Sequence, residues 1–317
     1  MARLIVSVVV GAEPHLVLGC LASLGAASGA HDVEIRVICN TPDAKLATEL
    51  ARRFPGIKVA QNEVPRGFAT NHNRALEAAD AAYFLIANDD LVFDPGSVAR
   101  SIEFLERPEN ARVAALSPKL LNPDRSVQRS TYRFPSVPRA LLDLSGIRDR
   151  IPHNRWTDRL AGYLRRGAGR SRFWPHDHTC DVETFRGAAM FVRAAAWREV
   201  GPLSELTRVG GEIAEWHRRC RGNGWRVVFF ADASVVHYRS RTVGRDPLLA
   251  SEYLKGYLFY FSRHRGPGIS LCFRAGAIPI AGMRLALAGL ARDRVATQLW
   301  RTNLSLLLRP LAAGRAP

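Results

Sequence analysis

The sequence contains neither a long hydrophobic run nor a cysteine framework, and the absence of each excludes some classes of protein. No stretch of about 18 consecutive apolar residues occurs, so a transmembrane helix is not predicted. The apolar stretch Leu4–Val10 is too short for a signal peptide and is typical of a buried first strand. The five cysteines form no C-x-x-C pair, which argues against a zinc finger or disulfides and favours a reducing, cytoplasmic setting.

Acidic residues are also scarce, with 29 Asp and Glu against 45 Lys and Arg, and the net charge is +16. The excess lies in two segments, residues 129–173 with +8 and residues 238–317 with +10, while the remainder sums to −2. Such segments attract nucleic acid, anionic lipid or phosphorylated substrates, and a solvated arginine-rich surface is the alternative. Nucleic acid is not expected as a partner, because no helix-turn-helix, zinc-finger or RNP-type pattern accompanies the charge.

Strand and helix patterns alternate through the first 106 residues. Apolar β-branched runs predict strands, and longer Ala-rich or amphipathic segments predict helices. The strands are expected at 4–10, 33–39, 57–60 and 83–87, and the helices at 14–27, 43–53, 68–79 and 95–106. This alternation is typical of an α/β protein with a Rossmann-like, doubly wound, mostly parallel sheet, which binds ligands at the carboxyl ends of its strands.

The pattern changes after this region. Residues 113–140 contain four prolines and are expected to be rich in loops. A helix is predicted at 212–221 and a strand at 225–230, and from about residue 250 the sequence is helical and basic.

Asn88-Asp89-Asp90 follows the fourth predicted strand, where a ligand site of such a sheet would lie. Two adjacent carboxylates repel each other, so a pair of this kind suits either a bound cation or a helix cap or Asx-turn. The spacing alone leaves both interpretations open.

This segment is one of eight whose order resembles the family 2 glycosyltransferases of the GT-A fold, especially the rhamnosyltransferase-like branch. The eight segments are Leu4–Val10, Val37–Asn40, Gly67–Asn73, Phe84–Gly96, Ser117–Pro135, Gly187–Gly201, Gly211–Val227 and His237–Thr242. The resemblance implies a GT-A domain over residues 1–245, with a donor half at about 1–125 and an acceptor half at about 126–245. Residues 246–317 would then form a basic helical C-terminal extension.

The resemblance also implies a metal-dependent, inverting transfer of a sugar, with rhamnose as the candidate. The donor would be a dTDP- or UDP-sugar, and the acceptor a glycan or a polyprenyl-diphosphate-linked saccharide. Mg²⁺ or Mn²⁺ would neutralise the donor diphosphate. By the same resemblance, Asp90 is the principal metal carboxylate, and His237 is a second metal or diphosphate contact.

The donor is expected at the ends of the first strands and on the segment that contains Gly67. The residues implied to bind it are Val10, Gly11, Glu13, Cys39, Asn40, Arg66, Gly67, Asn73, Asn88 and Asp89. Cys39 stands where the family usually has an Asp that accepts a hydrogen bond from the base, and a thiol is a poor substitute.

The largest departure from the family falls on the general base, because Ile213 occupies its position. Glu212 and Glu215 lie three residues apart, on one face of the predicted helix, and Glu212 is the favoured replacement. A catalytically degenerate GT-A protein, acting as a binding or scaffold subunit, is the alternative. Gly187 and Trp216 are assigned to the acceptor side, with Trp216 stacking on a sugar.

Two further segments allow more than one interpretation. Residues 269–291 hold apolar stretches broken by Arg274 and Arg284. They predict either a helix in the membrane interface, which would place the protein peripherally at the inner face of the plasma membrane, or a tail helix packed on the core. His176–Asp181 has an H-x-H-x-C spacing that matches no common zinc pattern and is expected to be a loop.

Overall fold

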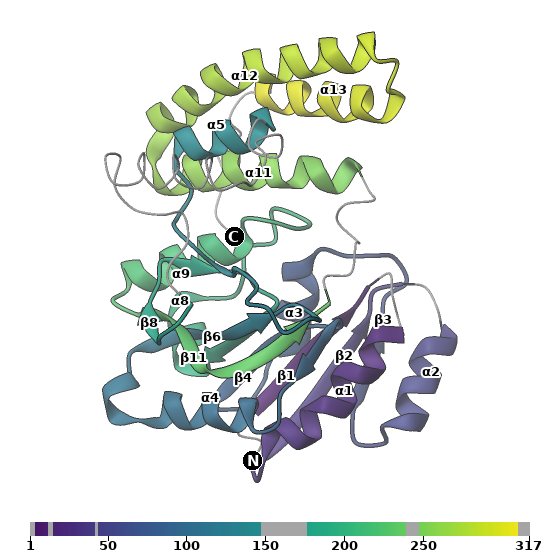
Figure 1. Cartoon of the computed structure of the whole chain (residues 1–317), viewed down its shortest axis with the longest axis vertical. Helices are drawn as coiled ribbons and strands as arrows, with labels where there is room; N and C mark the ends of the chain where they lie inside the picture. The colour runs from purple at the N-terminus through teal and green to yellow at the C-terminus, as the bar shows by residue number, and fades with distance from the viewer. Residues whose placement is uncertain (1–3, 12–14, 42–43, 147–175, 239–246, 310–317) are drawn as a thin grey trace. The chain divides into compact units, whose positions relative to one another are not determined.

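The computed structural model describes residues 4–11, 15–41, 44–146, 176–238 and 247–309. These residues belong to two compact units, which are described separately below (Figure 1). Unit 1 comprises Met1–Phe134, Phe173–Arg208 and Glu212–Thr242, and unit 2 comprises Pro135–Arg172, Val209–Gly211 and Val243–Pro317. Unit 2 therefore takes in residues that precede the predicted extension at 246–317.

Unit 1 is built on a nine-stranded sheet in the order β3-β2-β1-β4-β10-β6-β11-β5, with β8 paired to β11. The strands are β1 Leu4–Val10, β2 Val33–Cys39, β3 Lys58–Gln61, β4 Tyr83–Asn88, β5 Leu91–Phe93, β6 Val113–Leu121, β8 Cys180–Asp181, β10 Ala189–Arg193 and β11 Arg226–His237. The first four in the order run parallel, and β10 lies antiparallel between β4 and β6. A small second sheet pairs β7 Thr131–Tyr132 with β9 Thr184–Phe185.

Side chains of a strand point alternately to opposite faces, so an apolar strand presents a hydrophobic surface on each face of the sheet. Helices cover both of these faces. In β1, Leu4, Val6 and Val8 enter one hydrophobic cluster, while Ile5 enters the other. The helices on the first face are α1 His15–Ser28, α2 Ala44–Arg53 and α4 Ser97–Glu106, and those on the second face are α3 Phe68–Leu76, α8 Ala194–Val200 and α9 Glu212–Gly222 (Figure 1). A short 3₁₀ helix, η1, spans Pro108–Asn110. The predicted doubly wound α/β architecture is thus confirmed.

The expectation of loops at residues 113–140 is wrong for its first part. Residues Val113–Leu121 form β6, a buried strand between β10 and β11. Pro118 is tolerated there because it pairs with Phe230 at a break in the β6–β11 register, where a missing N–H costs little. Beyond that break β11 continues to His237, seven residues past the predicted end of the strand at 230.

Unit 2 is helical, as the sequence predicts from about residue 250. Its described helices are α5 Val137–Ser145, α11 Pro247–His264, α12 Gly266–Leu290 and α13 Arg294–Leu308. Tyr257, Phe261 and Phe273 form an aromatic cluster between α11 and α12. By length and composition α12 could cross a membrane, in contrast to the sequence-based expectation, although the core helix of a soluble protein also passes this test.

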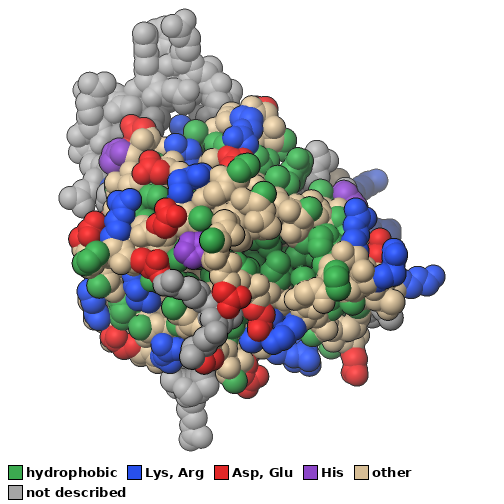
Figure 2. Space-filling model, turned by 90° about the horizontal axis from the view of Figure 1, so that it is seen from below, with side chains coloured by type: hydrophobic (Ala, Val, Ile, Leu, Met, Phe, Trp, Pro, Cys, Tyr) green, Lys and Arg blue, Asp and Glu red, His purple; other side chains and the backbone are tan. Residues whose placement is uncertain are grey.

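The basic excess does not form one uniform patch on the face drawn in Figure 2. Basic and acidic side chains both occur across this face, with hydrophobic side chains between them. Of the two basic segments, residues 147–173, 239–246 and 310–317 lie outside the described residues.

Two buried histidines make the stability of the fold depend on pH. The His72 Nδ1 atom lies 2.7 Å from the Ser7 hydroxyl, and His217 Nδ1 lies 2.9 Å from the Thr184 hydroxyl. Burial lowers the pKa of each imidazole to about 3, against an ordinary value of about 6.5. At these two sites the unfolded chain therefore binds more protons than the folded chain between pH 6.5 and pH 3, so these histidines make the fold less stable as the pH falls through that range.

We predict that the free energy of unfolding decreases between pH 6.5 and pH 3 by up to about 1.4 kcal/mol per pH unit for each of these histidines. Urea unfolding of the wild type and His72→Gln at several pH values measures the slope, which should be smaller in the variant. His15→Gln, at an exposed position, is the control. Equal slopes for wild type and His72→Gln would contradict the assignment.

Candidate active site

The turn between β4 and β5 holds the two adjacent carboxylates at an end of the sheet. Asp89 and Asp90 are both buried. The Asp89 Oδ2 atom accepts a 2.7 Å hydrogen bond from the Gly11 N–H, just after β1. The Asp90 carbonyl accepts one from the Tyr238 N–H, just after β11. The turn therefore joins the ends of three strands, as the sequence predicts for a ligand site of this fold.

His237 lies beside Asp90, with 3.4 Å between His237 Nε2 and Asp90 Oδ1. On the other side of the ring, His237 Nδ1 lies 2.7 Å from Gln128 Oε1. The Gln128 amide donates from Nε2 to the Asn122 Oδ1 atom and to the His237 carbonyl, which fixes its oxygen toward the ring. In the neutral ring Nδ1 then carries the proton, and the Nε2 lone pair faces Asp90.

Two acceptor atoms that face each other in a buried place suit a divalent cation with oxygen and nitrogen ligands. The hydrogen bond from Nδ1 to a side-chain oxygen is the usual way in which a protein orients a ligating histidine. Within the residues that the structure describes, no group of three or more His, Cys, Asp or Glu could hold a metal ion. A cation here would therefore need further ligands from a substrate, as Mg²⁺ commonly takes from phosphates.

Sequence reasoning missed Gln128, which orients His237. It lies 109 positions before His237 in the sequence, in a segment expected to be loop. No local pattern marks such a residue, and only the pairing of the strands brings the two together.

Of the donor residues predicted near the first two strands, some are buried in the core and one holds a neighbouring loop in place. Val10 and Cys39 are fully buried in the first hydrophobic cluster, so their side chains do not face a ligand. Asn40 Oδ1 accepts hydrogen bonds from the Arg66 N–H and from Asn62 Nδ2, so Asn40 fixes the loop before Gly67. Glu13 lies outside the described residues, and Asn88 is the last residue of β4.

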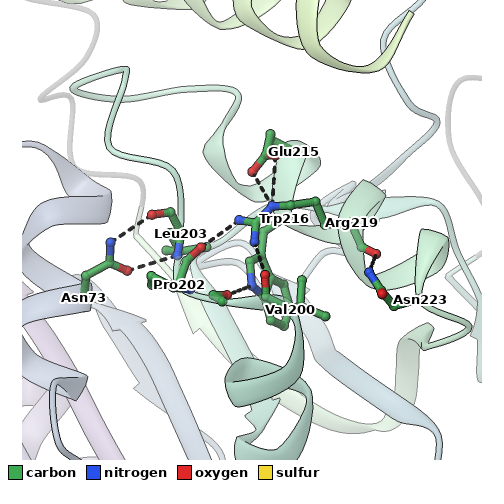
Figure 3. Close-up of polar contacts among 9 residues, drawn as sticks. Asn73, Val200, Pro202, Leu203, Glu215, Trp216, Arg219 and Asn223 are labelled. Carbon is green, nitrogen blue, oxygen red and sulfur yellow. Dashed lines mark hydrogen bonds and ion pairs between the residues drawn. The ribbon is translucent and has the colours of Figure 1, made fainter. Parts of the chain in front are cut away.

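The predicted donor role of Asn73 disagrees with its contacts. Its amide donates to the Leu203 carbonyl and accepts from the Leu203 N–H at 3.1 Å (Figure 3). The same amide also donates to Glu205. Gly67 also faces the chain after α8: a Cβ atom on it would lie 3.1 Å from the Arg208 backbone. Asn73 and Gly67 thus hold the segment that follows α8 against α3.

Arg66 lines an open cavity of about 640 Å³ beside α3 and α8. Arg74, Arg198, Phe84 and Trp197 also line it. Neither Asp89 nor Asp90 borders this cavity, so it is separate from the carboxylate turn.

Glu212 is the first residue of α9 and is buried. The Thr207 hydroxyl lies 3.5 Å from its Oε2 atom. A carboxylate at a helix N-terminus is stabilised by the backbone N–H groups and the helix dipole. Gly210 and Gly211 precede it with φ values of 90° and 97°, a conformation that favours glycine and lets the chain turn into the helix.

Glu215 and Trp216 are structural, in contrast to the roles predicted for them. Glu215 is almost fully buried and accepts two hydrogen bonds from Arg219 Nε, while Arg219 also donates to the Val200 and Pro202 carbonyls (Figure 3). Trp216 is fully buried and its Nε1 donates to the Gly201 carbonyl at 2.8 Å. Trp216 therefore has no exposed ring face for a sugar.

Ile213, at the family's base position, is buried in the second hydrophobic cluster. Gly187 packs directly on it, since a Cβ atom on Gly187 would lie 2.8 Å from Ile213 Cγ1. Residues 176–179 form the predicted loop, whereas Cys180 and Asp181 form β8. The His176 ring accepts a hydrogen bond from the Ser130 N–H.

Comparisons with known proteins show which family the chain belongs to. The family described as "Glycosyltransferase like family 2" matches residues 2–252. An N-acetylglucosaminyl-diphospho-decaprenol L-rhamnosyltransferase of Mycobacterium tuberculosis is 26% identical over 83% of this chain and 85% of its own length. An O-antigen biosynthesis protein of Myxococcus xanthus is 24% identical over 62% of this chain and 14% of its own.

Solved structures share the fold at low identity. A mannosyltransferase from Pyrobaculum calidifontis, solved with GDP-Man and Mn²⁺, is 16% identical with a TM-score of 0.53, over 97% of this chain and 81% of that one. A structure with UDP, GalNAc and Mn²⁺ is 14% identical with a TM-score of 0.53, over 84% and 52%. The chain belongs to the family 2 glycosyltransferases and has the predicted GT-A fold.

We predict that Glu215→Gln lowers the free energy of unfolding by about 1.5–3 kcal/mol, because the Arg219 guanidinium loses its charged partner in a part-buried place. The matched control is Glu199→Gln. Glu199 and Arg112 form an exposed pair at 3.8 Å, which should contribute less than about 1 kcal/mol. Urea unfolding measures both, and equal losses would mean that Glu215 has no special structural role.

Proposed function

We propose that this glycosyltransferase is metal-dependent and inverting, and that it transfers a sugar from a nucleotide-sugar donor to a lipid-linked or glycan acceptor. The observation that carries the proposal is the pair formed by Asp90 and the Gln128-oriented His237. The mycobacterial relative's name supports rhamnose as the sugar and a polyprenyl-diphosphate-linked saccharide as the acceptor. A dTDP-sugar is the first candidate donor, and a UDP-sugar is the second.

Asp90 and His237 would hold Mg²⁺ or Mn²⁺, which when bound stabilises the negative charge of the departing nucleoside diphosphate. The two solved structures that contain Mn²⁺ support the choice of a divalent cation. Asp89 holds the end of β1 through the Gly11 N–H, which keeps the donor side of the turn in place. Gln128 keeps the Nε2 lone pair of His237 directed at Asp90.

Glu212 would act as the general base. It takes the proton from the acceptor hydroxyl as that oxygen attacks the anomeric carbon in line with the departing diphosphate. Glu212 is favoured over Glu215, since Glu215 accepts two hydrogen bonds from Arg219 within the core.

One observation favours a second candidate function. Ile213 stands at the family's base position and is packed against Gly187 in the core. If no other carboxylate replaces the base, the protein binds the donor without efficient transfer and serves as a binding or scaffold subunit. We propose a cytoplasmic location for either function, with contact at the inner face of the plasma membrane.

We predict that Asp90→Asn abolishes both the metal-dependent thermal stabilisation by a nucleotide sugar and the transfer of its sugar. The reason is that a neutral amide is a weak ligand for a hard divalent cation. Thermal shift with dTDP- and UDP-sugars, with and without Mn²⁺, measures the first effect. Glu199→Gln should behave as the wild type, and unchanged stabilisation in Asp90→Asn would place the cation elsewhere.

We predict that Glu212→Gln lowers kcat by about 10²- to 10⁴-fold, the usual contribution of a general base. Donor binding should persist, because the variant changes proton transfer and leaves Asp90 and His237 intact. Radiolabelled sugar transfer to a polyprenyl-diphosphate-linked saccharide measures the rate. Metal-dependent donor binding by a wild type that transfers no sugar to water or to acceptor would favour the scaffold function.

A further inference from the structure

Helix α12 exposes only apolar side chains and glycine along its whole length. Every exposed position in Gly266–Leu290 is Leu, Met, Ala, Pro, Cys or Gly. The exposed side chains, apart from Pro267 in the first turn, are Leu271, Cys272, Ala275, Pro279, Met283, Ala286, Leu287 and Leu290. The residues 271, 275, 279, 283 and 287 follow each other at intervals of four, so they lie along one face of the helix. This stripe is called the outer face of α12 below.

The exposure of this face is large. Leu271 is 64% exposed, Leu287 54% and Leu290 83%. The helix has 25 residues and is about 37 Å long at 1.5 Å per residue. An apolar stripe of this length is unusual on the surface of a soluble monomer and marks an interaction surface.

The charged side chains of α12 point the opposite way. Its two charged residues are Arg274 and Arg284. Arg274 is 9% exposed and its Nη1 atom donates to the Leu307 and Arg309 carbonyls at the end of α13. Arg284 donates to the Ser145 carbonyl at 2.9 Å, and its guanidinium lies 4.8 Å from the centre of the Trp300 ring. Both guanidinium groups donate to backbone carbonyls inside unit 2, so the polarity of α12 is inverted relative to a helix that faces water.

The residues at the two ends of α12 indicate which apolar medium covers the outer face. Arg263 and Arg265 flank its start, and Arg292 and Arg294 flank its end. Residues 263–309 contain eight arginines and a single acidic residue, Asp293. An apolar stripe between two arginine pairs complements the hydrocarbon and the anionic headgroups of a phospholipid surface. A second copy of the chain would bring like-charged arginine pairs together, which is unfavourable.

We propose that the outer face of α12 binds the surface of an anionic phospholipid bilayer, with the helix axis in the plane of the interface. The opposite side of α12 packs against α5, α11 and α13, which leaves only one face open to lipid and disfavours a membrane-spanning position. The flanking arginines contact the headgroups, and the leucines and Met283 enter the acyl region. This binding requires neither donor nor cation, so it stands apart from the proposed transfer reaction.

Co-sedimentation of the full chain with vesicles tests the proposal. The wild type should bind phosphatidylcholine–phosphatidylglycerol vesicles at least tenfold more tightly than pure phosphatidylcholine vesicles at low ionic strength. The double variant Leu271→Gln/Leu287→Gln should lose at least tenfold in affinity for the anionic vesicles. Leu206→Gln is the control, because Leu206 is 62% exposed on unit 1.

Because the varied leucines are exposed, the double variant should unfold at the same urea concentration as the wild type. A second readout uses Cys272 on the outer face. In a Cys180→Ser background, an environment-sensitive fluorophore on Cys272 should shift to shorter wavelength when anionic vesicles are added.

Three results would overturn the proposal. The first is a wild type that does not bind anionic vesicles, and the second is a double variant that binds them as well as the wild type does. The third is a dimer, measured by light scattering, that dissociates in the double variant and leaves the fluorophore unaffected by lipid. That outcome would assign the outer face to a second copy of the chain.

Discussion

The pairing of β5 with the end of β11 is the constraint on which the candidate active site depends. It aligns Leu91 with His237 and Phe93 with Val235 in antiparallel register. Because Asp90 immediately precedes Leu91, this register places the carboxylate beside the imidazole. Residues 147 positions apart in the sequence thus meet in one buried place, and a one-residue slip would turn His237 to the other face of the sheet.

The pairing itself depends on an irregularity in β11. The register between β6 and β11 breaks at Phe230 and resumes at Ser234. A bulge of this kind re-aims the side chains that follow it. Pro118, one of the prolines that suggested a loop at β6, pairs with Phe230 at this break. The same irregularity therefore accommodates the proline and sets the direction of His237.

The sequence predicted the parallel half of the sheet well, because its strands are apolar β-branched runs that contrast clearly with the helices between them. Asp89 and Asp90 were found for the same reason, since they follow such a strand. Burial within a helix was harder to predict. A glutamate and a tryptophan suggested a helix face open to substrate. Helix α9 is instead packed on more than one side, so Glu215 and Trp216 are both buried.

Long-range partners could not be predicted from one sequence. Gln128 has no local signature, and the amide of Asn73 is committed to Leu203, 130 positions away. The inverted polarity of α12 was also hidden. Arg274 and Arg284 interrupt its apolar stretches in the sequence, and only the fold reveals that both point inward.

We propose that Asp90 and His237 together bind a divalent cation. The most direct measurement is an anomalous difference map from crystals of the full chain grown with Mn²⁺ and dTDP or UDP. We expect one strong peak within about 2.5 Å of both Asp90 Oδ1 and His237 Nε2, with diphosphate oxygens completing the coordination. A bound nucleotide without a peak at this position, or a peak held by other side chains, would contradict it.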